Sequence, residues 1–208
     1  MARLQSPDFE TKRGLMLDRA AEMFASKGFH GTSIADLAKA NGMSKSLLYH
    51  YFPSKEKLLR DVMASHIDDL VAATQAVVEE RLPAGKQLHA LVHQFMRLYV
   101  GAADRQKVLL NELDNLMAPD RQEIVAKQRR IVTAVRHMME AVHPQMAADR
   151  SASIARVMLL FGAMNWTANW FDPQGRLPVG QLADMIVDQA LAPLSPQGIG
   201  SVNYGQPS

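Results

Sequence analysis

Residues 28–59 read GFHGTSIADLAKANGMSKSLLYHYFPSKEKLL and contain three short helical patterns separated by polar breaks. Ser33 begins a capping-box pattern, which marks the start of a helix, and Asn41-Gly42 ends that helix after about two turns. Ser44 and Ser54 are each placed to cap the helix that follows. We therefore predict helices at about 34–40, 45–52 and 55–80, and the first two, joined by a tight turn, form a helix-turn-helix candidate.

The surface of helix 45–52 indicates a partner. Leu48 and Phe52 lie four residues apart and can face a core, which leaves a leucine, two tyrosines and a histidine largely outside. In a DNA major groove, Lys45 can reach guanine or phosphate, Ser46 a base edge and Leu47 a thymine methyl group. Neighbouring side chains can hold phosphates: Tyr49, Tyr51 and Lys55. The alternative is an ordinary helical hairpin whose tyrosines pack on neighbours.

Charge is unevenly distributed along the 208 residues. The first 60 carry ten Lys/Arg and six Asp/Glu, and the remaining residues carry thirteen and fifteen, so a net charge of +2 hides a basic first part. A polyanion partner for that part is therefore expected. The chain has no cysteine, which excludes disulfides, thiolate catalysis and cysteine-ligated metals. No signal peptide is evident, and the apolar stretch 157–171 is shorter than the roughly 20 residues a membrane span needs. We expect a cytoplasmic protein with no membrane partner.

The rest of the chain also has helical periodicity. We predict helices at about 86–103, 105–117, 120–142, 148–171 and 179–192, and no alternating strand pattern is found. The expected fold is all-α: an N-terminal three-helix unit with the helix-turn-helix, followed by a larger C-terminal helical bundle. The predicted boundaries are 1–53 and 54–192, with helix 55–80 connecting the two, and the Pro/Gly/Ser-rich residues 193–208 form a flexible tail.

The stretches 28–38 and 42–59 resemble the DNA-binding domain of the TetR family of transcriptional repressors. That resemblance implies an N-terminal helix-turn-helix DNA-binding domain and a C-terminal helical-bundle domain for ligand binding and dimerisation. It also implies a homodimer that binds a palindromic double-stranded operator and is released by a small-molecule effector. Ser46 stands where the family often has glycine or another small residue, which leaves the base preference there open. The DNA contacts that the resemblance implies are Thr32, Ser33, Ser44, Lys45, Ser46, Leu47, Tyr49, His50, Tyr51 and Lys55.

The segments 161–167 and 170–177 are similar to TetR-family members that respond to acyl-CoA thioesters. An acyl-CoA is therefore the expected effector, with another hydrophobic or aromatic small molecule as the alternative. Basic side chains on helix 120–142 are candidates for its phosphates, although they are more typical of a solvated helix face: Lys127, Arg129, Arg130 and Arg136. The residues expected in the pocket are Met96, Tyr99, Leu113, Met117, Arg130, Met138, Asn165, Trp166, Asn169 and Trp170.

Helix 148–171 is apolar nearly all round, which predicts burial on more than one side. One face would pack inside the subunit and the other against the second copy in the dimer. The residues expected at that interface are Phe161, Gly162, Leu182, Met185 and Ile186.

Two other classes of protein are considered. His89 and His93 have the spacing of metal ligands on one helix face, as a metal-dependent helical enzyme would require. No HExxH or paired-carboxylate signature accompanies them, and such histidines are more often partly buried side chains, so we expect no enzyme, no metal and no cofactor. The second of these classes, a helical bundle of the same fold that has lost DNA binding, is disfavoured because helix 45–52 keeps its outward-facing lysine, leucine and tyrosine side chains.

Overall fold

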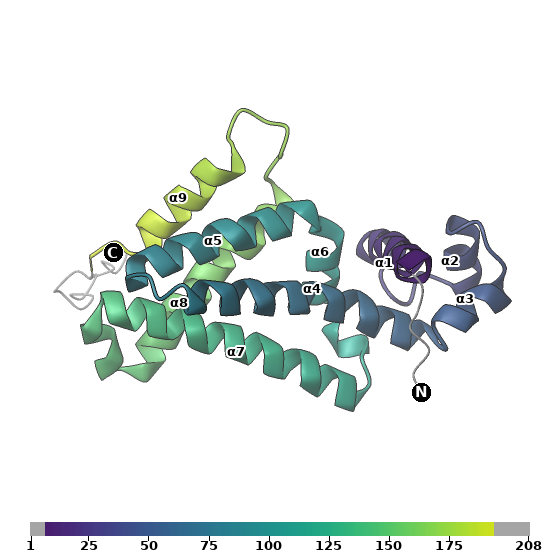
Figure 1. The fold of residues 1–208 in the computed structure, drawn as a ribbon, viewed down its shortest axis with the longest axis horizontal. Helices are drawn as coiled ribbons and strands as arrows, with labels where there is room; N and C mark the ends of the chain where they lie inside the picture. The colour runs from purple at the N-terminus through teal and green to yellow at the C-terminus, as the bar shows by residue number, and fades with distance from the viewer. Residues whose placement is uncertain (1–6, 194–208) are drawn as a thin grey trace, which may run out of the picture.

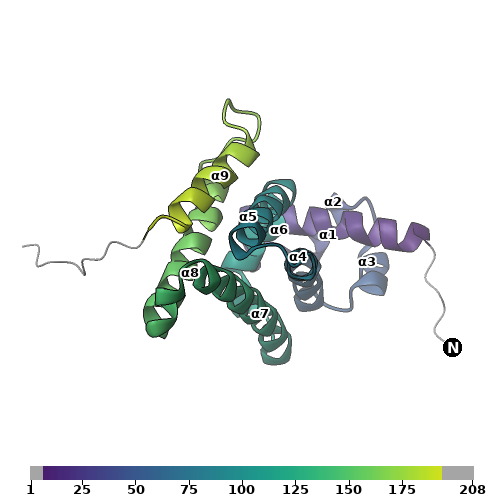
Figure 2. The same ribbon diagram turned by 60° about the vertical axis from the view of Figure 1, so that its left-hand side comes forward.

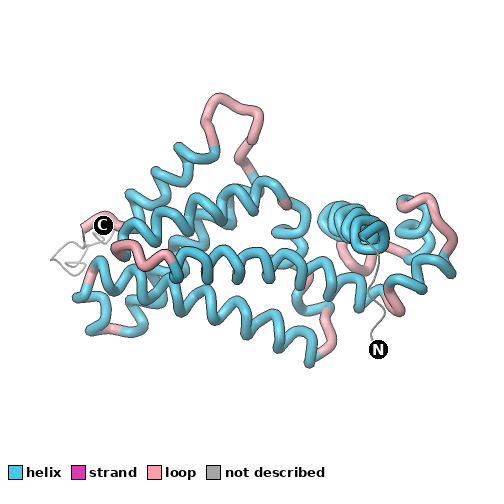
Figure 3. Tube along the Cα trace, viewed as in Figure 1, coloured by secondary structure: helices cyan, strands magenta, loops and turns pink. Residues whose placement is uncertain are grey.

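The computed structural model describes residues 7–193, and within this range every regular element is a helix (Figures 1 and 3). The all-α prediction is therefore confirmed for the described residues. Their helices, in order, are α1 (Pro7–Lys27), α2 (Ile34–Ala40), α3 (Lys45–Tyr51), α4 (Lys55–Glu79), α5 (Ala84–Gly101), α6 (Ala103–Asn111), α7 (Ala118–Val142), α8 (Arg150–Trp166) and α9 (Val179–Ala190). Short 3₁₀ turns follow α6, α7 and α8. The predicted tail lies, from residue 194 on, outside the described residues.

Helices α1 to α3 form a small unit at one end of the molecule, and α8 and α9 lie at the other end (Figures 1 and 2). The long helix α4 starts beside α3 and extends into the body, where it packs against α5, α6 and α7. Helix α6 also packs against α1, so two body helices contact the N-terminal unit. No helix in the described part of the chain combines the length and the hydropathy that a membrane crossing demands.

The body has a core of large apolar side chains and a polar edge between α4 and α7. Phe95 and Met96 of α5 are fully buried in the core. At the edge, Glu123 accepts hydrogen bonds from Lys127 and Arg60, each at 2.7 Å, and these bonds lower the pKa of Glu123 to about 2. Ion pairs that remain partly open to solvent contribute little individually, so the apolar core provides most of the contact between α4 and α7.

Two predicted helices end earlier than expected. Helix α6 stops at Asn111 rather than at 117, and α8 stops at Trp166 rather than at 171. Each of these helices is followed by a 3₁₀ turn. In the turn after α8, Thr167 donates its hydroxyl hydrogen to the Met164 carbonyl. Apolar residues continue beyond both ends, and this continuity made the helices seem longer in the sequence.

Candidate DNA-binding surface and ligand cavity

The turn between α2 and α3 is built as the sequence predicts. Gly42 has φ +64°, a left-handed conformation that side chains disfavour, and its N–H bonds to the Lys39 carbonyl. The Ser33 hydroxyl accepts the Asp36 N–H in a complete capping box, and the Ser44 hydroxyl accepts the Leu47 N–H. Both serines therefore serve as caps, which fixes where the two helices begin.

The outer face of α3 is left open to solvent. Leu48 is buried, whereas Leu47 is 46% exposed and Tyr49 is 48% exposed. The polar members of the predicted set on this helix are exposed as well: Lys45, Ser46 and His50. A short helix that exposes a leucine and a tyrosine beside a lysine has the side chains that read a major groove.

Two of the residues predicted to contact DNA are used inside the protein instead. Thr32 is 1% exposed, and its hydroxyl donates to the Gly28 carbonyl at 2.9 Å. Lys55 donates from Nζ to the carbonyls of Phe29 (2.9 Å) and Thr32 (3.0 Å) and lies 4.1 Å above the Phe29 ring. We correct both expectations, because these side chains hold loop 28–33 against the start of α4.

Tyr51 is partly enclosed rather than fully outward. Its ring stacks on that of Phe9 in α1, with centroids 4.7 Å apart and an angle of 16° between the planes. The ring therefore belongs to the α1–α3 contact, and its hydroxyl is the part that remains for a phosphate.

A cavity of about 230 Å³ lies within the body, with walls from α4, α5, α6, α7 and α8. Its walls are mostly apolar and include Ile67, Phe95 and Met158. Its polar lining comes mainly from Tyr99, Gln106, Gln128 and Asn165. Ligand sites usually combine such apolar walls with a few placed polar groups, so this is the candidate effector site.

Hydrogen bonds link the polar side of the cavity to the core. The His66 Nε2 lies 2.7 Å from the Gln106 Oε1, and the Gln106 Nε2 donates to the Asn165 Oδ1 at 3.0 Å. Burial lowers the pKa of His66, so the ring is neutral at neutral pH and donates from Nε2, because an amide oxygen can only accept. Burial raises the pKa of Tyr99. The cavity therefore presents neutral polar groups to a ligand.

Of the predicted pocket residues, the structure brings Tyr99 and Asn165 together in the cavity wall. Met96 and Met138 are buried in the core but do not line the cavity. Four of the remaining predictions follow the early ends of α6 and α8 and lie outside the lining: Leu113, Met117, Asn169 and Trp170. Trp166, the last residue of α8, is 66% exposed and also lies outside it.

Sequence reasoning missed His66, Gln106 and Gln128. The signal for His66 was present: it interrupts the apolar face Leu59, Met63, Ile67 of the fourth helix with a polar residue. Such an interruption predicts a buried group that needs a partner.

The four basic residues considered for phosphates fall into two groups. Lys127 is paired with Asp68 and Glu123, and Arg136 with Glu140. Arg129 and Arg130 are exposed. Arg130 borders a groove between α4 and α7, and Ile131 lines both this groove and the cavity.

The structure places some of the predicted interface residues inside the subunit and others on its surface. Leu182 and Ile186 are buried inside the subunit, and Phe161 lines the cavity, so we correct the expectation that these three face a second copy. Met185 and Gly162 are exposed. Leu182 and Ile186 are covered because α9 packs against α5 and α8, whereas Phe161 on α8 faces the cavity.

A recognition helix with an open outer face, joined through α4 to a helical body with a partly open cavity between its helices, defines a ligand-responsive helix-turn-helix regulator. A family model of bacterial regulatory proteins of the tetR family matches residues 16–62, and one of the tetracyclin repressor-like C-terminal domain matches residues 81–194. The chain therefore belongs to the TetR family of DNA-binding transcriptional regulators.

Individual relatives agree with this placement. A TetR-family regulator from Bordetella parapertussis 12822 is 37% identical, with a TM-score of 0.85 over 88% of this chain and 95% of that one. The transcriptional repressor KstR2 of Rhodococcus jostii (strain RHA1) is 28% identical over 83% of this chain and 85% of its own length. AibR, solved with isovaleryl coenzyme A and operator DNA, is 25% identical, with a TM-score of 0.76 over 88% of this chain and all of that one.

Proposed function

We propose that the protein is a cytoplasmic, homodimeric repressor that leaves a palindromic operator when an acyl-CoA thioester binds in the cavity. The observation that carries this proposal is the presence, on one chain, of the exposed α3 face and the apolar cavity with its polar lining. The ligand of AibR supports the thioester class, because AibR is similar over its whole length. We keep residues 1–53 as the DNA-binding domain and 54–192 as the ligand-binding and dimerisation domain, joined by α4.

The size of the cavity indicates how a thioester would sit. Sites that enclose a whole drug-sized ligand measure about 300–1,000 Å³. The cavity, at about 230 Å³, suits a short acyl chain, with Asn165 near the thioester carbonyl. The rest of the coenzyme would continue into the α4–α7 groove, where Arg130 is exposed beside Ile131. Arg130 would bind the phosphates, since a guanidinium group can form bidentate hydrogen bonds with phosphate.

The exposed apolar residues of α8 and α9 support a dimer. Leu159 is 73% exposed, Trp166 66% and Met185 58%, and Gly162 lies between the first two on the same face of α8. Large exposed apolar patches mark interaction surfaces, and a small residue lets helices approach closely. We propose these four residues as the dimer interface in place of Leu182 and Ile186.

Helix α6 supplies a route from the ligand to the DNA-binding domain. Gln106 lines the cavity, and its neighbour Arg105 pairs with Asp18 of α1 at 2.7 Å. Arg105 also donates to the Ser65 hydroxyl of α4 at 3.0 Å. A ligand that moves Gln106 would therefore move α1 and the two recognition helices, whose separation must match one turn of DNA, about 34 Å. The shift in DNA affinity can be no larger than the ligand's differential affinity for the two states.

The first experiment measures binding to DNA from upstream of the protein's own gene, by mobility shift and footprinting. We expect one protected palindrome and release by acyl-CoA thioesters, with short chains most effective. Affinity that is insensitive to salt, or the absence of a protected palindrome, would refute the DNA-binding part. Release by aromatic acids but by no thioester would refute the effector class.

The second experiment tests how the thioester sits. Arg130→Gln should weaken binding of an acyl-CoA but not of the corresponding free acid, while Asn165→Ala should weaken both. Arg150→Gln removes another exposed arginine, at the start of α8, and serves as the control. Equal affinities for the coenzyme thioester in the Arg130 and Arg150 variants would contradict the phosphate assignment.

A further inference from the structure

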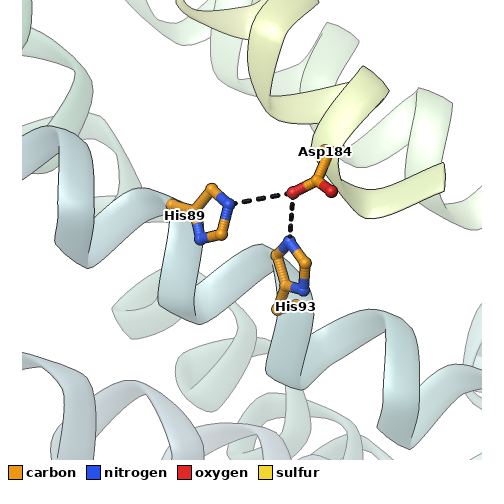
Figure 4. Close-up of side chains that lie close together, drawn as sticks. All are labelled: His89, His93 and Asp184. Carbon is orange, nitrogen blue, oxygen red and sulfur yellow. Dashed lines mark hydrogen bonds and ion pairs between the residues drawn. The ribbon is translucent and has the colours of Figure 1, made fainter. Parts of the chain in front are cut away.

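Three metal-ligand side chains meet where α9 packs on α5, outside the cavity and the DNA-binding surface (Figure 4). The His89 and His93 Nε2 atoms lie 2.9 Å and 2.7 Å from the same oxygen, Oδ1 of Asp184. The imidazole rings are stacked, with centroids 4.2 Å apart and 24° between their planes. The ligand atoms of all three residues lie within 4.8 Å of one another.

The helices bring these atoms together by simple spacing. His89 and His93 are one turn apart on α5, so both rings project from the same face. Asp184 is one turn after Gly180 on α9, and a Cβ placed at Gly180 would lie 3.9 Å from the His93 ring. The α9 backbone therefore passes beside the His93 ring, at a distance where even an added Cβ would make only ordinary van der Waals contact. Two histidines from one helix and a carboxylate from another is a known arrangement of transition-metal ligands.

The distances between the three ligand atoms would fit a small cation if the side chains moved slightly apart. Zinc binds histidine nitrogen and carboxylate oxygen at about 2.0–2.2 Å, so tetrahedral ligand atoms are roughly 3.3–3.5 Å apart. The separations of 2.7 Å and 2.9 Å must widen by about half an ångström, and the half-exposed His89 and Asp184 side chains have room to do so. Three protein ligands leave a fourth position for water.

The ligand set also indicates which metals fit. Magnesium and calcium prefer sites built entirely from oxygen, whereas imidazole favours zinc and other first-row transition metals.

We propose that His89, His93 and Asp184 form a binding site for a divalent transition metal, with zinc as the reference ion, that ties α9 to α5. This revises the expectation of no metal, and we attach no reaction to the site. Because the three ligands converge only in the folded chain, the metal stabilises the position of α9 by mass action. The site does not rest on the proposed effector or on DNA binding.

The test uses the untagged full-length protein, stripped with a chelator that is then removed. Zinc is titrated in competition with a chromogenic chelator, and we expect one ion per chain. Asp184→Asn and His89→Gln should each weaken zinc binding by about 100-fold or more, since even residues that only support a ligand cost 10–100-fold. Asp188→Asn, one turn further along α9, and His137→Gln on α7 are exposed controls that should keep full affinity.

Cobalt(II) gives a second readout, because its visible absorption reports coordination by protein ligands. We expect a cobalt spectrum in the wild type and in both controls, and its loss in the two site variants, with unchanged circular dichroism throughout. Failure of the wild type to retain zinc would overturn the proposal. Zinc binding or a cobalt spectrum that survives in Asp184→Asn and His89→Gln would overturn it as well.

Discussion

The side chain of Lys55 has two possible roles, a contact with a DNA phosphate and a structural contact inside the protein, and the two roles make opposite predictions. The sequence places it at a phosphate, whereas the structure has its ammonium group bound to two carbonyls of loop 28–33. We therefore expect Lys55→Met to destabilise the fold and to leave the salt dependence of DNA binding unchanged. Methionine keeps the length and the apolar stem of the side chain while removing the charge and the donor hydrogens.

The expected loss of stability can be worked out from the contacts of Lys55. Hydrogen bonds to a charged group contribute about 1.5–3 kcal/mol each, and the partial exposure of Lys55 places its two bonds at the low end. The contact with the Phe29 ring adds about 0.5 kcal/mol. A cation in the first turn of α4 is disfavoured by roughly 0.3–1 kcal/mol, which offsets part of the gain. The net loss is about 2–3 kcal/mol, or a fall in Tm on the order of 5–10 °C.

Thermal and urea unfolding measure the stability, and fluorescence anisotropy with duplex DNA at several salt concentrations measures the phosphate contacts. Losing one phosphate contact makes the slope of the logarithm of the DNA-binding constant against the logarithm of the salt concentration less steep by about 1. Lys57→Met is the matched control, because Lys57 Nζ is 4.0 Å from Asp61, at the limit of an ion pair. Asp61 keeps its closer partners Arg13 and Arg60, so the change should cost less than about 1 kcal/mol. If Lys55→Met keeps the Tm of the wild type and loses one unit of salt slope, the structural role is wrong.

Further predictions follow from four other residues. Leu47→Ala should weaken operator binding by about 1–3 kcal/mol in a mobility-shift titration, with unchanged Tm, because its side chain is exposed on α3. Gly42→Ala should cost about 1–2 kcal/mol in urea unfolding because φ is +64° there, whereas Gly101→Ala, which has no such φ, should not. The lowered pKa of His66 means that stability is complete above about pH 6.5 and falls below it, and His66→Gln should remove that part of a stability-against-pH curve. Glu123, with a pKa of about 2, should stabilise the fold above about pH 4.5, and Glu123→Gln should flatten the loss of stability between pH 4.5 and pH 2.

The helix-turn-helix could be predicted in detail because its signals are local. Ser33, Ser44 and Gly42 act within four residues of their own position, so spacing alone defines caps and turn. The outward direction of Lys45 and Leu47 follows from helical periodicity once Leu48 is assigned to the core.

The side chains that act at longer range could not be assigned in this way. Lys55 is far in sequence from Phe29, and only the folded chain shows that their contact uses the ammonium group internally. Gln106 and Asn165 come from different helices, so the cavity's polar lining depends on how α6 packs against α8. Trp166 was expected in the ligand pocket but is exposed. An apolar residue near a helix end predicts burial, but the sequence does not show whether a ligand, the same subunit or a partner covers it.

Helix α6 begins without a side-chain cap at Ala102, and its last turn is closed by the Glu112 N–H, which donates to the Val108 carbonyl at 3.0 Å. It is held from the side, through Arg105 toward α1 and through Gln106 toward the cavity. Adjacent residues on a helix project about 100° apart, so rotation of this nine-residue segment about its own axis moves both contacts at once. Under the proposed mechanism, a ligand that displaces Gln106 on one side of α6 would therefore also turn Arg105 and its contact with α1 on the other side.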